Sequence, residues 1–327
     1  MIKLQYTNPV YPQYFADPFA WQHEGVYYAI GTSDSAPVQR AGTELVFPIL
    51  RSDDFVTWEY ASDGLVRPDH DLGTDFWAPE IAYSGGRFYM YYSVGGGDKG
   101  HNLRVAVSEH PAGPYHDTGA IIDKDVCPFS IDAHPFQDED GQWYLFYARD
   151  FLDENDGYRA GTALVVDRLL SMTELAGDER TVLRAHYDWQ LFMAQRDMDG
   201  TIWDWHTLEG AFVRKHEGRY YCLYSGGRWE DESYGVDYGV ADNILGPYSD
   251  AGAENGPRIL KTIPGHVRGP GHNSVVTGPD GVTDYIVYHA WDENRTARKL
   301  CLDKLIWTSD GPRCAGPTWT PQEIETI

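Results

Sequence analysis

The amino-acid sequence predicts an all-β protein, a five-bladed β-propeller. Three observations support this prediction: aromatic residues and glycine are abundant, helical periodicity is nearly absent, and one β-hairpin pattern recurs five times. The 327 residues include 11 Trp, 23 Tyr, 12 Phe and 34 Gly. Because aromatic residues favour strands and glycine favours tight turns, this composition indicates many short strands.

The recurring unit begins with a polar residue and a short apolar stretch, continues through a turn rich in Gly or Asp, and ends in an aromatic strand. The five copies begin at Asp17, Glu80, Asp132, Glu209 and His272. They recur about every 55 to 77 residues, which is enough for four short strands per copy. No Ser- or Pro-rich linker divides the chain, so we expect residues 1–327 to form a single propeller domain.

The charge of the chain excludes several classes of partner. Lys and Arg number 26 and Asp and Glu number 50, for a net charge of −24, which would repel nucleic acid and anionic membranes. Without an apolar run of spanning length or a signal-peptide pattern, we expect a cytoplasmic protein. The four cysteines form no C-x-x-C pair and are expected to be reduced thiols. The acidic run that begins at Glu230 is interpreted as a solvated turn.

The residues that open the repeats are candidates for a shared site, because the innermost strands of a propeller line one channel. Four carboxyl groups and an imidazole around one axis cost desolvation and repulsion unless a site uses them. The chain lacks a nucleotide-binding motif and a Ser-His-Asp order. A pocket of carboxyl groups and aromatic rings favours glycoside hydrolysis, which needs one protonated acid and one carboxylate.

Five short segments recur in a recognisable order, and they are Tyr14-Phe-Ala-Asp17-Pro-Phe, Phe76-Trp77-Ala78-Pro79-Glu80, Ser130-Ile-Asp132-Ala-His-Pro, Leu208-Glu209-Gly-Ala and Gly269-Pro-Gly-His272-Asn-Ser. Together they resemble the segments of glycoside hydrolase family 43, the arabinofuranosidases, arabinanases and β-xylosidases built on a five-bladed propeller. The resemblance implies that Asp17 is the general base, Glu209 the general acid, and Asp132 the carboxylate that tunes and orients Glu209. It also implies inversion at the anomeric carbon and a supporting role for Glu80.

The resemblance extends to sugar-binding and metal-binding residues. Trp77 is expected to be a sugar platform, since an indole face packs against sugar C–H groups. Arg295 is expected to reach sugar hydroxyls, with Arg298 as the competing candidate. His272 resembles a channel histidine that binds a calcium ion through waters, the alternative being a hydrogen-bonding role only; the chemistry itself requires no cofactor. The residues expected to wall the pocket are Phe19, Phe129, Ile131 and His206.

The favoured function is exo-acting release of xylose or arabinose from short xylo- or arabino-oligosaccharides. Residues 188–204, which include Phe192, are expected to close the pocket. An arabinan-specific exo- or endo-1,5-α-L-arabinanase and a non-catalytic sugar-binding propeller remain alternatives. The retaining fructan and sucrose hydrolases fit less well, because Glu209 is followed by Gly210 rather than cysteine.

Overall fold

Strands make up most of the computed structural model, which describes residues 3–34, 36–97 and 99–326. The helical content of these residues is limited to the 3-10 turns η1 (His70–Leu72), η2 (Asn155–Gly157) and η3 (Asp188–Gln190). The all-β prediction is therefore confirmed. Within the described ranges, no helix has the length and apolar character needed to cross a membrane.

The first two large sheets follow each other along the chain. One contains β2 (Ala16–His23), β3 (Val26–Thr32), β5 (Thr43–Ser52) and β6 (Glu59–Val66), with β4 (Val38–Arg40) paired to β5. The next contains β7 (Asp75–Ser84), β8 (Arg87–Gly96), β9 (Lys99–Ser108) and β10 (His116–Ala120). In both sheets the successive pairs are antiparallel, as expected for strands joined by short turns.

The remaining strands form a nine-stranded sheet, a four-stranded sheet and a terminal pair. The nine strands are β11 (Ser130–Gln137), β12 (Trp143–Phe151), β13 (Gly161–Ser171), β14 (Glu174–Leu175), β15 (Arg180–Leu183), β16 (Leu191–Met198), β17 (Thr201–His216), β18 (Arg219–Gly226) and β19 (Gly235–Ala241). The four-stranded sheet contains β20 (Arg268–Thr277), β21 (Asp284–Trp291), β22 (Arg298–Thr308) and β23 (Gly311–Cys314). The two ends of the chain meet where β1 (Lys3–Tyr6) pairs with β24 (Gln322–Glu325).

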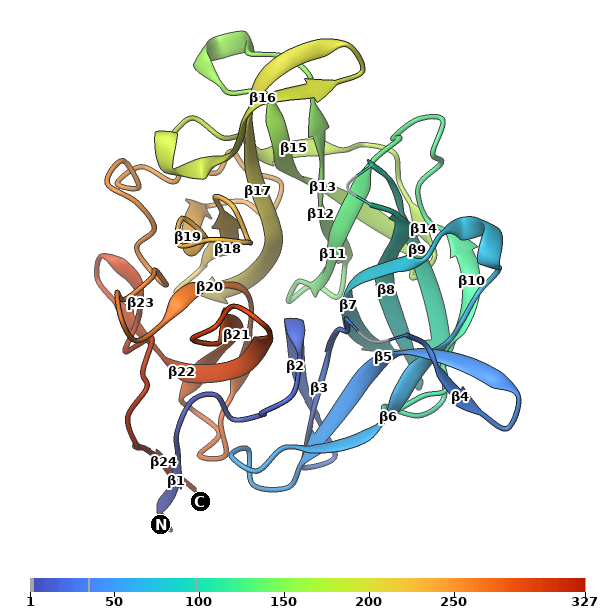
Figure 1. Ribbon diagram of the computed structural model, residues 1–327, viewed down its shortest axis with the longest axis vertical. Coiled ribbons are helices and arrows are strands. Elements are labelled where there is room, and N and C mark those ends of the chain that lie inside the picture. Colours follow the sequence, from blue (N-terminus) through green and yellow to red (C-terminus); the bar gives the residue numbers. More distant parts are fainter. Residues whose placement is uncertain (1–2, 35, 98, 327) are drawn as a thin grey trace.

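The sheets surround a central axis, as in a β-propeller (Figure 1). Strand β2 contacts β7, β7 contacts β11, β11 contacts β17, β17 contacts β20, and β20 contacts β2 again, so the five strands close a ring. The nine-stranded sheet runs without interruption from β11 to β19, so the boundaries of the sheets do not by themselves give the number of blades.

Aromatic side chains hold neighbouring sheets together. Phe47 of β5 packs edge-on against Tyr92 of β8, with ring centroids 5.9 Å apart. Tyr221 of β18 meets Trp307 of β22 in the same way at 5.1 Å. Edge-to-face pairs of this kind add stability beyond the area they bury. Much of the aromatic content therefore belongs to the packing between sheets.

Candidate active site

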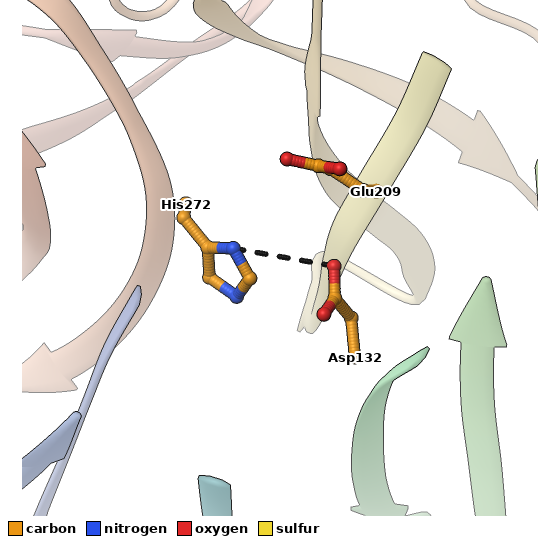
Figure 2. Close-up of side chains that lie close together, drawn as sticks. All are labelled: Asp132, Glu209 and His272. Atoms are coloured by element: carbon orange, nitrogen blue, oxygen red, sulfur yellow. Dashed lines mark ion pairs between the residues drawn. The ribbon is translucent and has the colours of Figure 1, made fainter. Parts of the chain in front are cut away.

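A cavity of about 480 Å³ opens at one end of the central ring. It is lined by Asp17, Trp77, Gly97, Ile131, Asp132, Phe192, Met193, Glu209, Trp229, Glu230, His272 and Arg298. Figure 2 shows Asp132, Glu209 and His272 pointing toward one another from different strands. The three proposed catalytic carboxyl groups and the channel histidine, far apart in the sequence, are thus brought together in one cavity.

Each of the five inner strands carries a β-bulge at the cavity. The pairing register shifts there, and one residue takes a positive φ: 50° at Asp17, 43° at Ala78, 56° at Asp132, 59° at Gly210 and 48° at His272. A bulge bends the strand and redirects its side chains, which is why bulges are frequent beside active sites. The bulges therefore turn these residues toward the axis.

A bulge also removes a backbone N–H from the ladder, and that donor needs another partner. The N–H of Ala78 donates to Thr32 Oγ1 at 2.9 Å, and that of His272 donates to Ser225 Oγ at 2.7 Å. In each case the acceptor belongs to the preceding unit of the ring. The same pattern closes the ring at Asp17, whose N–H donates to His289 Nδ1 of β21 at 3.0 Å.

Asp17 lies in a positively charged setting. Arg298 Nη1 donates to Asp17 Oδ1 at 3.1 Å, and the guanidinium also bonds the hydroxyl of Tyr14. His272 Nδ1 lies 3.5 Å from the same carboxylate oxygen. Burial acts to raise the pKa of Asp17, but the Arg298 guanidinium, followed by the imidazoles of His272 and His289, holds it well below its usual range. Asp17 is therefore ionised at neutral pH.

Glu209 and Asp132 lie in the opposite kind of environment. Burial raises the pKa of Glu209 to about 7; a 2.6 Å hydrogen bond from the Tyr234 hydroxyl opposes this shift, and the charge of Asp17 adds to it. Burial and the charges of Glu209 and Asp17 likewise raise the pKa of Asp132 well above its usual value. Like charges in one cavity cannot all be ionised at low cost, so Glu209 retains a proton near neutral pH.

The backbone around Glu209 is held by Asp132. Asp132 Oδ2 accepts the N–H of Gly210 at 2.9 Å, so the carboxyl group fixes the bulge that carries Glu209. The ring of His272 lies directly over Gly210, where an added Cβ would stand 3.2 Å from the imidazole Cγ. A larger residue at position 210 would therefore disturb both Glu209 and His272.

Asp132, Glu209 and His272 place ligand atoms within 4.8 Å of one another, a spacing compatible with a metal ion. Calcium takes about six to eight oxygen ligands, whereas this group offers one imidazole and two carboxyl groups. Burial raises the pKa of both carboxyl groups, so both favour the protonated form over the charged form that calcium needs. Direct coordination of calcium does not fit these residues, and a water-bound ion beside His272 stays a prediction.

A second layer of side chains lies beneath the cavity, two residues after each bulge. Glu80 Oε2 accepts a 2.7 Å hydrogen bond from His134 Nδ1, and His134 Nε2 accepts the N–H of Val213 at 3.0 Å. The rings of Phe19 and Phe212 lie 6.3 Å apart in the same layer. Glu80 therefore occupies a supporting position that joins two neighbouring sheets.

Three of the residues predicted to wall the pocket lie outside the cavity lining. Trp77 and Ile131 line the cavity, but Phe19, Phe129 and His206 are absent from its lining among the described residues. Phe19 packs in the core beneath it, and the buried His206 directs its Nδ1 to the backbone oxygen of Asp204 at 2.9 Å. Phe129 lies edge-on to His101, which itself stacks on Trp77.

The arginine of the cavity is Arg298. The exposed Arg295 bonds the backbone oxygen of Glu230 and does not belong to the described lining, whereas Arg298 is buried against Asp17. Arg295 lies in the turn after β21, with a positive φ of 56°, whereas Arg298 is the first residue of β22. The two arginines are therefore close in sequence, but one lies in an exposed turn and the other at the cavity.

Sequence reasoning missed Trp229, Glu230, Met193, Tyr234 and His289. Trp229 stacks on Trp291 at 6.0 Å, and the Arg298 guanidinium lies 4.5 Å above its ring. Glu230 lies in a turn, as interpreted from its acidic run, and it also lines the cavity. The pairing of an aromatic residue with a carboxylate in Trp229-Glu230 is a sequence signal that could have indicated a sugar-binding position. Nothing in the sequence distinguishes Tyr234 or His289 from core residues.

Comparisons with known proteins agree with this geometry. The family model described as Glycosyl hydrolases family 43 matches residues 6–312. The beta-D-galactofuranosidase xynD of Aspergillus niger is 29% identical over 93% of this chain and 83% of its own length. An extracellular exo-alpha-(1->5)-L-arabinofuranosidase of Streptomyces chartreusis is 27% identical, covering 87% and 82%.

Among solved structures, a thermostable family-43 glycoside hydrolase superposes with a TM-score of 0.82 and 31% identity, covering 97% of this chain and 98% of that one. The family-model match over residues 6–312 includes the inner strands and every residue of the cavity. Enzymes of this family need no cofactor for catalysis and act with inversion. The chain belongs to glycosyl hydrolases family 43 and is an inverting glycoside hydrolase.

Proposed function

We propose that the enzyme is exo-acting and releases a terminal arabinofuranose or xylose from short arabino- or xylo-oligosaccharides. The observation that carries this proposal is the cavity of about 480 Å³, in which an ionised Asp17 and a protonated Glu209 both belong to the lining. The exo-arabinofuranosidase of Streptomyces chartreusis supports the same assignment. Phe192 and Met193, on the β16–β17 hairpin, wall the cavity and favour a chain end over an internal bond.

In this mechanism Asp17 is the general base and Glu209 the general acid. Asp17 takes a proton from a water molecule, which attacks the anomeric carbon from one face of the sugar. Glu209 donates its proton to the glycosidic oxygen as that bond breaks on the other face, so the configuration inverts. Arg298 keeps Asp17 ionised for the first step, and the Tyr234 hydroxyl orients Glu209 for the second.

Asp132 orients the acid in this proposal, because its bond to the N–H of Gly210 holds the bulge that carries Glu209 in place. The tuning of the pKa of Glu209 by Asp132 stays a prediction. The sugar platform is Trp77, supported from behind by the ring of His101 at 3.5 Å. Trp229, Glu230 and Ile131 complete the wall around the bound sugar.

The relative from Aspergillus niger favours a second candidate, release of β-D-galactofuranose. β-D-Galactofuranose has the ring configuration of α-L-arabinofuranose and carries one additional hydroxymethyl group. The same carboxyl groups would serve both reactions, and the wall around the exocyclic carbon would discriminate between them. An endo-acting arabinanase and a binding-only propeller are the remaining alternatives.

A panel of nitrophenyl glycosides tests the proposal. We expect the wild-type enzyme to release nitrophenol from the α-L-arabinofuranoside or the β-D-xyloside, and Asp17→Asn to lower kcat/KM by about 10²- to 10⁴-fold. Asp199→Asn, in an exposed turn, is the matched control and should behave as wild type. Preferred hydrolysis of the β-D-galactofuranoside would establish the second candidate, and internal cleavage of linear arabinan would establish the endo-acting alternative.

We infer that the propeller has five blades. The five bulged inner strands form a closed ring, and four of their displaced N–H groups bond to side chains of the unit before. Within the nine-stranded sheet, β13 and β17 are joined through a short parallel pairing at Gly161 and Thr162, where one blade would pass into the next. The single domain, the calcium ion and the cytoplasmic location stay predictions.

A further inference from the structure

A second and larger cavity, of about 950 Å³, lies beside the catalytic one. Its walls come from the N-terminal segment, the first sheet and the start of the second, with a contribution from the turn before β22 and the first residues of that strand. The side chains that matter for its chemistry are Tyr11, Tyr14, Val38, Tyr60, Asp63 and Asp75. We call this cavity the side groove.

The side groove and the catalytic cavity share three connections. Trp77 lines both. Asp75 of the side groove accepts the N–H of Gly97, a residue of the catalytic cavity, at 2.6 Å. Tyr14 of the side groove accepts a 2.7 Å hydrogen bond from Arg298, which holds Asp17. A ligand that fills the side groove therefore lies next to the catalytic cavity, on the side of Trp77, Gly97 and Arg298.

The surface of the side groove is suited to neutral sugar rings. Tyr60 and Val38 remain 45% and 40% exposed there, although both are large apolar side chains. Exposed aromatic faces pack well against the C–H groups of sugars, and carboxylates accept hydrogen bonds from sugar hydroxyls. Four aspartates line the groove against one arginine and one lysine, so an acidic sugar would be repelled.

We propose that the side groove binds the neutral sugar units that follow the scissile bond, and that the enzyme prefers oligosaccharides of three or more sugars over disaccharides. This inference rests on the proposed function, since it assumes that the terminal sugar occupies the catalytic cavity. The proposed function concerns the sugar that is released, and this inference adds the length and charge of the oligosaccharide that the enzyme prefers.

The test compares kcat/KM on a nitrophenyl arabinofuranoside with that on 1,5-linked arabino-oligosaccharides of two to four units. For an enzyme that prefers the xyloside, the matching xylo-oligosaccharides are used. We expect kcat/KM of the wild type to rise by about tenfold from the disaccharide to the tetrasaccharide. Tyr60→Ala should lower the ratio of tetrasaccharide to nitrophenyl activity by about three- to tenfold, since it removes the aromatic face.

Tyr83→Ala is the matched control, because Tyr83 is a 50% exposed tyrosine on β7 that lines neither cavity. It should leave the ratio at the wild-type value, and Tyr60→Phe, which keeps the ring, should retain most of it. If Tyr60→Ala melts at a much lower temperature than the wild type, Val38→Ser is the second variant that alters the groove, and it should lower the same ratio. A tetrasaccharide bearing a glucuronate on a unit beyond the cleaved bond should react more slowly than its neutral counterpart.

Two results would overturn the inference: a wild-type enzyme whose kcat/KM does not depend on chain length, or a Tyr60→Ala enzyme with an unchanged ratio. Equal rates on the neutral and glucuronate-bearing tetrasaccharides would contradict the charge argument. Failure of the proposed function looks different, because the wild type would then release no nitrophenol from either the arabinofuranoside or the xyloside.

Discussion

Neighbouring side chains drive two carboxyl groups of one cavity to opposite ionisation states. Asp17 is paired with Arg298, and this charge outweighs the effect of burial on its pKa. Glu209 has a tyrosine hydroxyl as its hydrogen-bond partner instead, so burial raises its pKa to about 7. A base that stays ionised and an acid that stays protonated are what an inverting hydrolase needs near neutral pH.

We expect the pKa of Glu209 to set the upper pH limit of activity, and Tyr234 to shift that limit. The hydrogen bond from its hydroxyl lowers the pKa of Glu209, so Tyr234→Phe should raise that pKa and move the alkaline limb of kcat/KM to higher pH. The sign follows because activity needs protonated Glu209 and falls as pH rises through its pKa. We also expect kcat to fall by about tenfold at the optimum, since the acid loses its orienting bond.

The pH dependence of kcat/KM measured from pH 4 to 10 checks this prediction. Tyr115→Phe is the matched control, because the buried Tyr115 hydroxyl donates to the backbone oxygen of Pro111, and Tyr115 does not line the described cavity. An alkaline limb that stays in place in Tyr234→Phe would show that another group titrates there.

At the scale of strands, each bulge leaves a backbone N–H that needs a hydrogen-bond acceptor from the preceding unit of the ring. Thr32, Ser225 and His289 meet it from equivalent places, because each is paired with the residue just before a bulge in its own sheet. The corresponding residue of β12 is Ala148, which has no acceptor in its side chain. The carboxyl group of Asp132 instead accepts the N–H of Gly210, so the position of Asp132 affects the position of the neighbouring Glu209.

Gly271, which precedes the bulge of β20, provides space for the ring of Tyr234. An added Cβ would stand 2.1 Å from Tyr234 Cε1, so Gly271→Ala must displace the tyrosine that orients Glu209. We expect the free energy of unfolding to fall by about 1–3 kcal/mol and kcat to fall by about tenfold or more. Denaturant unfolding and nitrophenyl glycoside kinetics measure the two effects.

The control for this variant lies just beyond the far end of the same strand. At Gly278 an added Cβ would stand 2.5 Å from the ring of Tyr285, which is buried away from the cavity. Gly278→Ala should therefore lose comparable stability and keep its kcat. If both variants lost kcat alike, the effect of Gly271→Ala would be one of general destabilisation.

At the scale of the whole molecule, the ring needs no metal ion for its chemistry. The clustered donors Asp132, Glu209 and His272 include the proposed general acid, and a cation bound to Glu209 would compete with its proton. We therefore expect dialysis against a chelator to leave kcat within about twofold of the untreated enzyme, although removal of a water-bound ion would lower the melting temperature. Loss of kcat that calcium restores and magnesium does not would contradict this expectation.

The strand-rich class, the five recurring hairpins and the carboxyl groups of the cavity were predictable from local sequence. Aromatic strands and Gly- or Asp-rich turns are encoded over a few residues, and the polar residues that open each repeat stand out against an apolar strand. The bulges were not predictable, and they decide which side of a strand faces the cavity. For this reason Phe19 and Glu80, two residues beyond a bulge, lie in the layer beneath the cavity.

The sequence by itself determined the all-β class, the repeat and the identity of Asp17, Asp132 and Glu209, because each depends on local pattern or on a short motif. Only the tertiary structure decided that Arg298 rather than Arg295 lines the cavity, that Tyr234 holds Glu209, and that a side groove adjoins the cavity. Those features depend on contacts between units far apart in the chain, and the closure of the ring sets those contacts.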